Sequence, residues 1–266
     1  MDTPYAASAD VHVLPTHLPI PGAGVLPINA FVLHAEEPVL VDAGLNAESD
    51  DFVDALASVI DPAAIRWIWL THDDADHTGS LQRVMELAPH ARLVCHGLAA
   101  MRMSSWWPVP LDRVHAIRPG DRVPVGDRTL RAVTPPLFDN PMSTGFLDEA
   151  TGALFSVDSF GAILPEPAQR AEDVPAEALA GGMAGWALTD SPWTNLVDRT
   201  RFANTLDAVR ALVPTSIFSS HLPAAAGVSL DRFVDVLAGV PDAPPVLGPS
   251  AEEFSMMLEA SAPAVL

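Results

Sequence analysis

The sequence predicts an α/β fold, arranged as a sandwich in which helices cover the outer faces of two sheets (αβ/βα). Two observations predict it. Short runs of β-branched and aromatic residues alternate with segments of helical periodicity, as where the strand-like run Ile65–Leu70 leads to a helix starting near Ser80. An Asp or His also follows the end of one predicted strand after another. Because loops at one edge of the sheet converge in α/β folds, we expect these side chains to share a site.

Composition narrows the class of protein. The chain has 266 residues, of which 49% are hydrophobic, so a sizeable core can form and a disordered chain is excluded. Its formal net charge is −20, and every basic residue is Arg. So acidic a surface repels phosphate backbones and anionic lipids, and we expect neither nucleic acid nor membrane partners. We see no internal repeat and no domain boundary, so residues 1–266 are expected to form a single domain.

Cysteine usage and the N-terminal residues indicate the compartment. The single cysteine, Cys95, excludes an internal disulfide, and its apolar surroundings favour a small buried side chain. The N-terminal residues lack the basic and apolar regions of a signal peptide, and no apolar run approaches the roughly 20 residues that span a bilayer. We therefore expect a soluble, unprocessed, cytoplasmic protein.

The N-terminal part predicts a β-meander followed by a helix. Strand-like runs cover residues 11–14, 27–33 and 38–42, separated by a Pro/Gly stretch and an acidic turn. A helix then begins at Ser49 or Asp50, because apolar residues recur at helical spacing as far as Ile60. Asp42 ends the third strand, where it acts either as a cap or turn residue or as a hydrogen-bond partner of a metal ligand.

The loop after the next predicted strand has the highest density of candidate metal ligands. Between Thr71 and Gly79, five candidate metal ligands occupy six positions: His72, Asp73, Asp74, Asp76 and His77. An isolated acidic turn of this kind usually caps the following helix. Two histidines five residues apart, interleaved with carboxylates at the end of a buried strand, favour a metal site instead.

The rest of the chain continues the alternation of strands and helices. Strands are predicted at 91–96, 122–125, 128–133, 152–157 and 217–219, and helices at 80–88, 98–103, 193–212, 229–238 and 249–260. Residues 134–142 form a Pro-rich loop, and 162–190 form a covering loop with a short helix at 176–183. Of the adjacent Trp106 and Trp107, one is expected to line a pocket. His90 and His96 are interpreted as lying outside any ligand set.

Four segments together resemble the metallo-β-lactamase superfamily over nearly the whole chain. NAFVLHAEEPVLVDAGL is similar to its early hairpin, IRWIWLTHDDADHTGS to its H-x-H-x-D-H loop, LFSVDSFG to its bridging-Asp strand and SSHLP to the segment with its last His. The resemblance implies a four-layer αβ/βα sandwich that holds metal at one edge.

One departure from that motif points to one branch of the superfamily, and a second residue departs from the pattern of that branch. Asp74 stands where the hydrolases have a second His, and this resembles the flavodiiron, oxygen-binding di-iron branch, in which a carboxylate occupies the position. The H-W-P-x-S segment of that branch falls on residues 139–143, with Asp139 in place of the His. By position, one metal has His72, Asp74, Asp139 and Asp158, and the other has Asp76, His77, Asp158 and His221, so that Asp158 bridges.

The resemblance leaves two functions open. The resemblance implies two metal ions. Iron is favoured over manganese or zinc, because one imidazole and three carboxylates form a hard donor set. The first function is a di-iron protein that binds or reacts with dioxygen or a related small oxidant, with electrons from an external donor because no flavodoxin-like region is seen. The alternative is a metal-dependent hydrolase of a small ester, lactone or thioester, with Asp74 or Asp76 as the catalytic proton acceptor. A fold that binds one metal, or none, is the remaining alternative.

Overall fold

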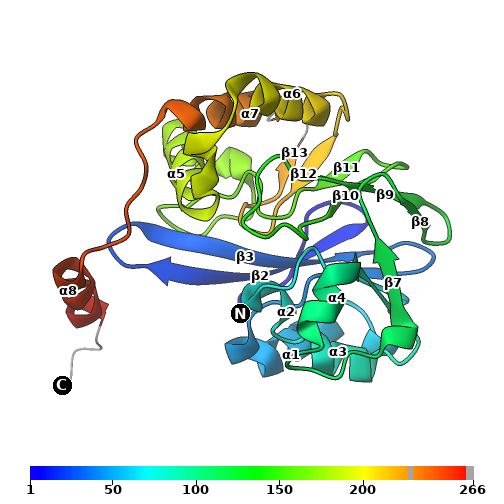
Figure 1. Cartoon of the computed structure of the whole chain (residues 1–266). Coiled ribbons are helices and arrows are strands. Elements are labelled where there is room, and N and C mark those ends of the chain that lie inside the picture. The colour runs from blue at the N-terminus through cyan, green and yellow to red at the C-terminus, as the bar shows by residue number, and fades with distance from the viewer. Residues whose placement is uncertain (227–229, 262–266) are drawn as a thin grey trace.

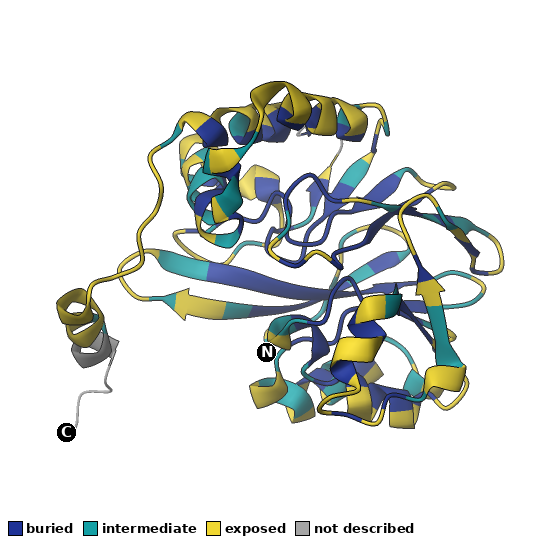
Figure 2. Cartoon of the chain, viewed as in Figure 1, coloured by how far each residue is buried: buried dark blue, intermediate teal, exposed yellow. Residues whose placement is uncertain are grey.

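The computed structural model describes residues 1–226 and 230–261, and it is built of four layers. Two sheets pack face to face, and helices cover both outer faces (Figure 1). The apolar layer between the sheets joins side chains such as Phe31 and Trp69 of one sheet to Phe146 and Phe155 of the other. Figure 2 shows the strands largely buried and the outward faces of the helices exposed. The predicted αβ/βα sandwich is confirmed.

The first sheet has seven strands in the order β1-β2-β3-β4-β5-β6-β7. Its strands are β1 Tyr5–Ala6, β2 Val11–Ile20, β3 Gly24–Leu33, β4 Val39–Val41, β5 Trp67–Trp69, β6 Arg92–His96 and β7 Val114–Ile117. The pairs from β1 to β4 are antiparallel and those from β4 to β7 parallel. The predicted strand at 11–14 extends to Ile20, because β2 pairs with β3 over its whole length. Pro15 is tolerated within it because β1 pairs only with residues 12–13, so that beyond them β2 is an edge strand and needs no N–H on its open side. The sequence reading missed β7.

The second sheet has six strands in the order β13-β12-β11-β10-β9-β8. They are β8 Arg122–Pro124, β9 Thr129–Val133, β10 Gly145–Asp148, β11 Ala153–Phe155, β12 Ser216–Phe218 and β13 Ala225–Ala226. The predicted hairpin at Gly126 is present, with φ of 82° at that glycine, where residues other than glycine are strained. The sequence reading missed β10, which lies in a stretch with few strand signals.

The helices beside the first sheet match the prediction. They are α1 Ser49–Val59, α3 Leu81–Leu87 and α4 Gly97–Met103, and their apolar side chains form one core with that sheet. A single helical turn, α2 Ala75–Thr78, lies inside the ligand loop. Short 3-10 turns complete the chain: η1 Asn46–Glu48, η2 Pro62–Ala64, η3 Leu111–Arg113, η4 Ala171–Asp173, η5 Pro192–Leu196 and η6 Val240–Asp242.

The helices beside the second sheet differ from the prediction at two places. α5 spans Ala176–Asp190, so the short helix predicted at 176–183 is present and continues to Asp190. Small residues hid its full length, because its Ala and Gly positions carry no apolar period, although Leu179 and Met183 bury against the sheet. The helix predicted over 193–212 is η5 followed by α6 Arg199–Arg210, since Asp198 caps a new start by accepting from Arg201 N–H. α7 Leu230–Gly239 also covers this sheet, whereas the last helix, α8 Ala251–Ser261, lies apart from it (Figure 1), and Ser229 lies outside the described residues.

The topology brings several strand ends to one edge of the sandwich. β4 leads into Asp42 and the parallel β5 into the loop that begins at Thr71. In the facing sheet, β11 leads into Asp158 and the parallel β12 into His221. Parallel neighbours end at the same edge, so residues far apart in sequence meet there. Within the described residues, no helix has the length and apolar character needed to cross a bilayer.

Candidate metal centre

Asp158 is the centre of the site. Its carboxylate lies among three imidazoles: Oδ2 is 3.4 Å from His72 Nε2, and Oδ1 is 3.4 Å from His77 Nε2 and 3.2 Å from His221 Nε2. The side chain is 2% exposed. The structure therefore brings together the four residues whose convergence the sequence-based fold requires.

The remaining predicted ligands form two groups around Asp158. The two-histidine site contains Asp76, whose Oδ2 is 3.3 Å from His77 Nε2 and 3.5 Å from His221 Nε2. The carboxylate site contains His72, whose Nε2 is 3.6 Å from Asp74 Oδ2 and 3.9 Å from Asp139 Oδ1. Atoms that bind one divalent ion at about 2.1 Å are typically about 3 to 4 Å apart, so both spacings suit a shared ion. All seven predicted ligands therefore lie in one site.

Hydrogen bonds on the far side of each ring aim the imidazoles. Asp42 Oδ2 lies 2.8 Å from His77 Nδ1, and the carbonyl oxygen of Pro27 lies 2.8 Å from His221 Nδ1. Since a carboxylate and a carbonyl can only accept here, each Nδ1 carries the proton and each Nε2 turns a lone pair to the site. The sequence reading left Asp42 as either a cap or a partner of a ligand, and the structure makes it the partner.

His72 is aimed through a hydroxyl. Thr71 Oγ1 donates to Asp42 Oδ2 at 2.9 Å and lies 3.1 Å from His72 Nδ1. Because its proton is already donated to Asp42, the hydroxyl oxygen accepts from Nδ1–H. His72 Nε2 then faces Asp158 with its lone pair. Asp42 thus orients two of the three imidazoles.

A separate network holds Asp74. Asn140, which is 4% exposed, donates from Nδ2 to Asp74 Oδ1 at 2.8 Å and to Asp73 Oδ1 at 3.0 Å. Asp73 also pairs with Arg102 Nε at 2.9 Å through its other oxygen. Asp73 is therefore neutralised away from the site, whereas Asp74 keeps Oδ2 for a metal. The sequence reading did not single out Asn140.

Backbone strain surrounds the carboxylates. Of the described residues other than glycine, four have positive φ, and three of them are Asp42 at 59°, Val157 at 58° and Phe160 at 69°. Such a conformation is an outlier for a β-branched residue and costs of the order of 1–3 kcal/mol. Strain of this kind persists where the surrounding structure demands one geometry, and here it flanks Asp158 on both sides.

Two buried atoms of the site lack a hydrogen-bond partner among the described residues. They are His77 Nε2 and Asp158 Oδ1, both of which face the two-histidine site. A buried polar atom without a partner costs roughly 1–3 kcal/mol, and a coordinated cation would satisfy both. The site also holds more carboxylates than imidazoles. The donor set and the two orphaned atoms therefore fit divalent metal ions.

The ionisation of the acids reflects their crowding. Burial, and then the charges of Asp158 and Asp190, raise the pKa of Asp139 to about 8. Burial, and then the charge of Asp158, raise the pKa of Asp190 to about 7. Burial would lower the pKa of His77, but the carboxylates of Asp76, Asp42 and Asp158 outweigh it and raise that pKa well above its usual value. Without a cation, these groups retain protons that ordinary acids and imidazoles would release.

Asp190 is the other group in this cluster that the sequence reading missed. One of its oxygens lies within 4.8 Å of oxygens of Asp139 and Asp158. The residue ends α5, beyond the short helix predicted at 176–183, and it follows no predicted strand, so no signal in the sequence pointed to it. His90 and His96 lie outside the site, as predicted; His96 caps α4 by accepting from Leu98 N–H.

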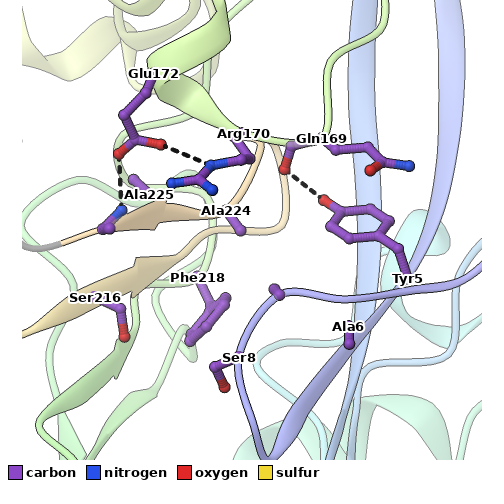
Figure 3. Close-up of a pocket in the computed structure, with 12 residues that line it drawn as sticks. Tyr5, Ala6, Ser8, Gln169, Arg170, Glu172, Ser216, Phe218, Ala224 and Ala225 are labelled. Carbon is purple, nitrogen blue, oxygen red and sulfur yellow. Dashed lines mark hydrogen bonds and ion pairs between the residues drawn. The ribbon is translucent and has the colours of Figure 1, made fainter.

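Two further pockets lie outside the cluster of predicted ligands. A 260 Å³ pocket lies between β1 and β13, and Figure 3 shows the Tyr5 hydroxyl donating to the Gln169 carbonyl there while Arg170 pairs with Glu172. None of the predicted ligands lines it. Trp106 is 57% exposed and lines a hollow beside Asp73, whereas Trp107 is 5% exposed and belongs to the core. The expectation that one of the two lines a pocket is confirmed.

Comparison with known sequences finds a family model and several relatives. The model described as ODP family beta lactamase matches residues 26–186. Diflavin flavoprotein A 1 of Synechocystis sp. is 28% identical over 134 residues, which are 50% of this chain and 23% of that protein. Flavo-diiron protein FprA2 of Clostridium acetobutylicum is 26% identical over 140 residues, 52% of this chain and 35% of the relative. The anaerobic nitric oxide reductase flavorubredoxin of Salmonella typhi is 30% identical over 134 residues, 50% and 28% respectively.

Solved structures share the fold over most of the chain. Rubredoxin oxygen:oxidoreductase of Desulfovibrio gigas has a TM-score of 0.78 at 19% identity and covers 90% of this chain, which matches 61% of that one. The flavodiiron protein of Giardia intestinalis has a TM-score of 0.79 at 15% identity, over 91% of this chain and 60% of its own. A fragment of putative diflavin flavoprotein A 5 of Nostoc sp. has a TM-score of 0.74 at 15% identity, over 90% and 95%. The matched sequence region thus spans about a quarter to a third of these curated relatives.

Proposed function

The chain belongs to the ODP family beta lactamases, and from this premise we propose that it holds two metal ions, iron before manganese or zinc, and binds or reduces dioxygen or nitric oxide. The predicted resemblance to the flavodiiron branch of the metallo-β-lactamase superfamily is confirmed by its relatives. Some of these are named for a di-iron centre or for nitric oxide reduction. The proposal takes residues 1–266 as one such domain in the cytoplasm.

The carboxylate site is the observation that carries the proposal. His72 contributes its only imidazole, and Asp74, Asp139 and Asp158 surround it. Hard oxygen donors favour iron or manganese, whereas a pocket of three imidazoles favours zinc. Metal-dependent hydrolysis does not require oxygen donors in preference to imidazoles. The proposed ligands are His72, Asp74, Asp139 and Asp158 for one ion, and Asp76, His77, Asp158 and His221 for the other.

The residues of the chain would hold and orient this centre. When bound, a pair of iron ions supplies electrons and open positions to a small oxidant. Asp42 and Thr71 keep the imidazole lone pairs aimed inward, and Asn140 keeps one oxygen of Asp74 free. Because two ferrous ions supply only one electron each, repeated turnover consumes electrons from outside, and the proposal includes an external electron donor.

Elemental analysis and oxygen exposure test the proposal. Protein from iron-replete cells should contain iron, or manganese, in preference to zinc, at close to two ions per chain. Anaerobic ferrous protein exposed to dioxygen or nitric oxide should develop a near-ultraviolet charge-transfer band. Protein that holds zinc, stays colourless in oxygen and cleaves generic esters or lactones would overturn the redox function in favour of metal-dependent hydrolysis, with Asp74 or Asp76 as proton acceptor.

A further inference from the structure

We infer that Asp190, at the C-terminal end of α5, is an additional ligand of the carboxylate site, so that this site binds a hard divalent cation through four carboxylates and one imidazole. The inference rests on the proposed function. It assigns a metal-binding role to a residue outside all four segments that resemble the superfamily, and to a helix that covers the second sheet.

Geometry places Asp190 within reach of the ion. Oxygens of Asp139, Asp158 and Asp190 all lie within 4.8 Å of one another, and Asp139 is at the same time within that distance of His72 and Asp74. Two oxygens on opposite sides of one ion, each bound at about 2.1 Å, are about 4.2 Å apart. A side-chain movement of less than about 1 Å would therefore let Asp139, Asp158 and Asp190 share the ion.

Electrostatics give the reason for a cation there. The C-terminal end of a helix carries partial negative charge, so a carboxylate at that end is unfavourable, and the last turn of α5 has no basic residue to offset it. Among the described residues, Asp190 forms no ion pair with an Arg, and its hydrogen bond comes from the Ser191 hydroxyl at 3.1 Å. Among the described residues, none of the three carboxylates that face one another, Asp139, Asp158 and Asp190, forms an ion pair with an Arg. A divalent cation would offset their mutual repulsion.

Packing shows that α5 is fitted against the centre. One turn before Asp190, Trp186 lies against His221 with 4.7 Å between ring centroids. Gly161 makes this approach possible, because a Cβ there would lie 2.5 Å from Trp186 Nε1 and 2.8 Å from His221 Cβ. The same helix that holds Trp186 against one proposed ligand therefore delivers Asp190 to the others.

The test compares two variants of one helix that each remove one negative charge. Asp190→Asn keeps the shape of the side chain at the site, and Glu177→Gln changes an exposed acid in the first turn of α5. Manganese is the probe, because free Mn²⁺ can be counted by electron paramagnetic resonance as it is titrated into metal-free protein. We expect two Mn²⁺ per chain in the wild type and in Glu177→Gln. Asp190→Asn should bind the second ion at least about tenfold more weakly.

The melting temperature supplies a second measurement, in which the difference between Asp190→Asn and the wild type should change sign between the metal-free and the metal-loaded protein. At pH 8, metal-free Asp190→Asn should melt at a higher temperature than the metal-free wild type, by about 2–4 °C, because one of three repelling carboxylates is gone. With saturating Mn²⁺ the order should reverse. A residue that only supports the fold would lower the melting temperature in both states.

The outcomes separate the inference from the function on which it rests. If the wild type and Asp190→Asn both bind two Mn²⁺ with equal affinity, Asp190 is not a ligand, while the proposed di-metal function stands. If the wild type binds no Mn²⁺ and no ferrous ion, the function and the inference fail together. Weakening of the second ion in Asp190→Asn but not in Glu177→Gln supports the inference.

Discussion

The two halves of the candidate metal centre share Asp158 but are built differently. In the two-histidine site, His77 and His221 are buried and each is held from behind by a buried acceptor, Asp42 or the Pro27 carbonyl. In the carboxylate site, the side chains of Asp74 and Asp139 are 32% and 34% exposed, and His72 is the one enclosed ligand besides the shared Asp158. The two-histidine site is therefore the more rigid half, and the carboxylate site carries the larger negative charge.

The largest effect is expected from the residue that both halves share. Asp158→Ala should abolish binding of at least one metal and weaken the other, because a bridging carboxylate contributes to both. It should also lower the free energy of unfolding by about 3–5 kcal/mol, since removing one member of a buried charged cluster leaves the rest uncompensated. Elemental analysis and thermal melting measure the two effects. Unchanged metal content would rule out the bridging role.

The order of metal binding tests the comparison directly. The two-histidine site matches the superfamily pattern at every position, whereas Asp74 and Asp139 both depart from it, so we expect the two-histidine site to fill first at sub-stoichiometric metal. Anomalous diffraction from crystals at increasing metal concentration would show the order. Chelation should then lower the melting temperature, because an ion at one hundred times its Kd stabilises the fold by about 2.7 kcal/mol. Earlier filling of the carboxylate site would reverse the hierarchy.

Asp42→Asn removes a support rather than a ligand, directly behind His77 and, through Thr71, behind His72. The amide cannot accept from His77 Nδ1 and Thr71 as the carboxylate does, so the two-histidine site should lose about 10- to 100-fold in metal affinity. Asp54→Asn, on an exposed face of α1, is the matched control. Isothermal titration with ferrous ion or Mn²⁺ measures both. Equal losses in the two variants would show that Asp42 does not orient the ligand.

Asn140→Ala is the corresponding change for the carboxylate site. It frees Oδ1 of Asp74 and removes one partner of Asp73, which keeps its pair with Arg102. We expect about a tenfold loss of affinity at the carboxylate site and none at the two-histidine site. Asn140→Asp should lose more, because it places a third carboxylate against two others. A loss confined to the two-histidine site in the same titration would contradict the network.

The smallest expected effect is on the pH dependence of the metal-free protein. Asp139 and Asp190 have pKa values raised to about 8 and about 7, so between pH 5 and 8 the folded state binds more protons than the unfolded state. Stability should therefore fall as pH rises through this window. Bound metal displaces these protons, so the metal-loaded protein should show no such fall. Urea melts at pH 6 and 8, with and without Mn²⁺, measure it; a metal-free protein that is more stable at pH 8 would contradict the prediction.

The sequence alone predicted the four-layer fold and the ligands of both candidate metal sites. Local patterns were sufficient because β-branched runs, turn residues and the dense 72–77 loop each carry their signal in a few neighbouring positions. Asp158 and His221 were found because each follows a strand, and strands in such a sheet end at one edge. The placing of the seven side chains in one site agrees with that reading.

Tertiary structure decided which other side chains reach the centre. Asp190 enters on α5, whose Ala and Gly positions hide the helical period, and Asn140 meets Asp74 across 66 residues of chain. The choice between a cap and a support for Asp42 also depended on packing, because only the folded chain brings His77 against it. Contacts of this kind are set by where two elements cross in space. Such crossings leave no period or spacing in the sequence. The sequence therefore predicted the candidate ligands but not the residues that support or surround them.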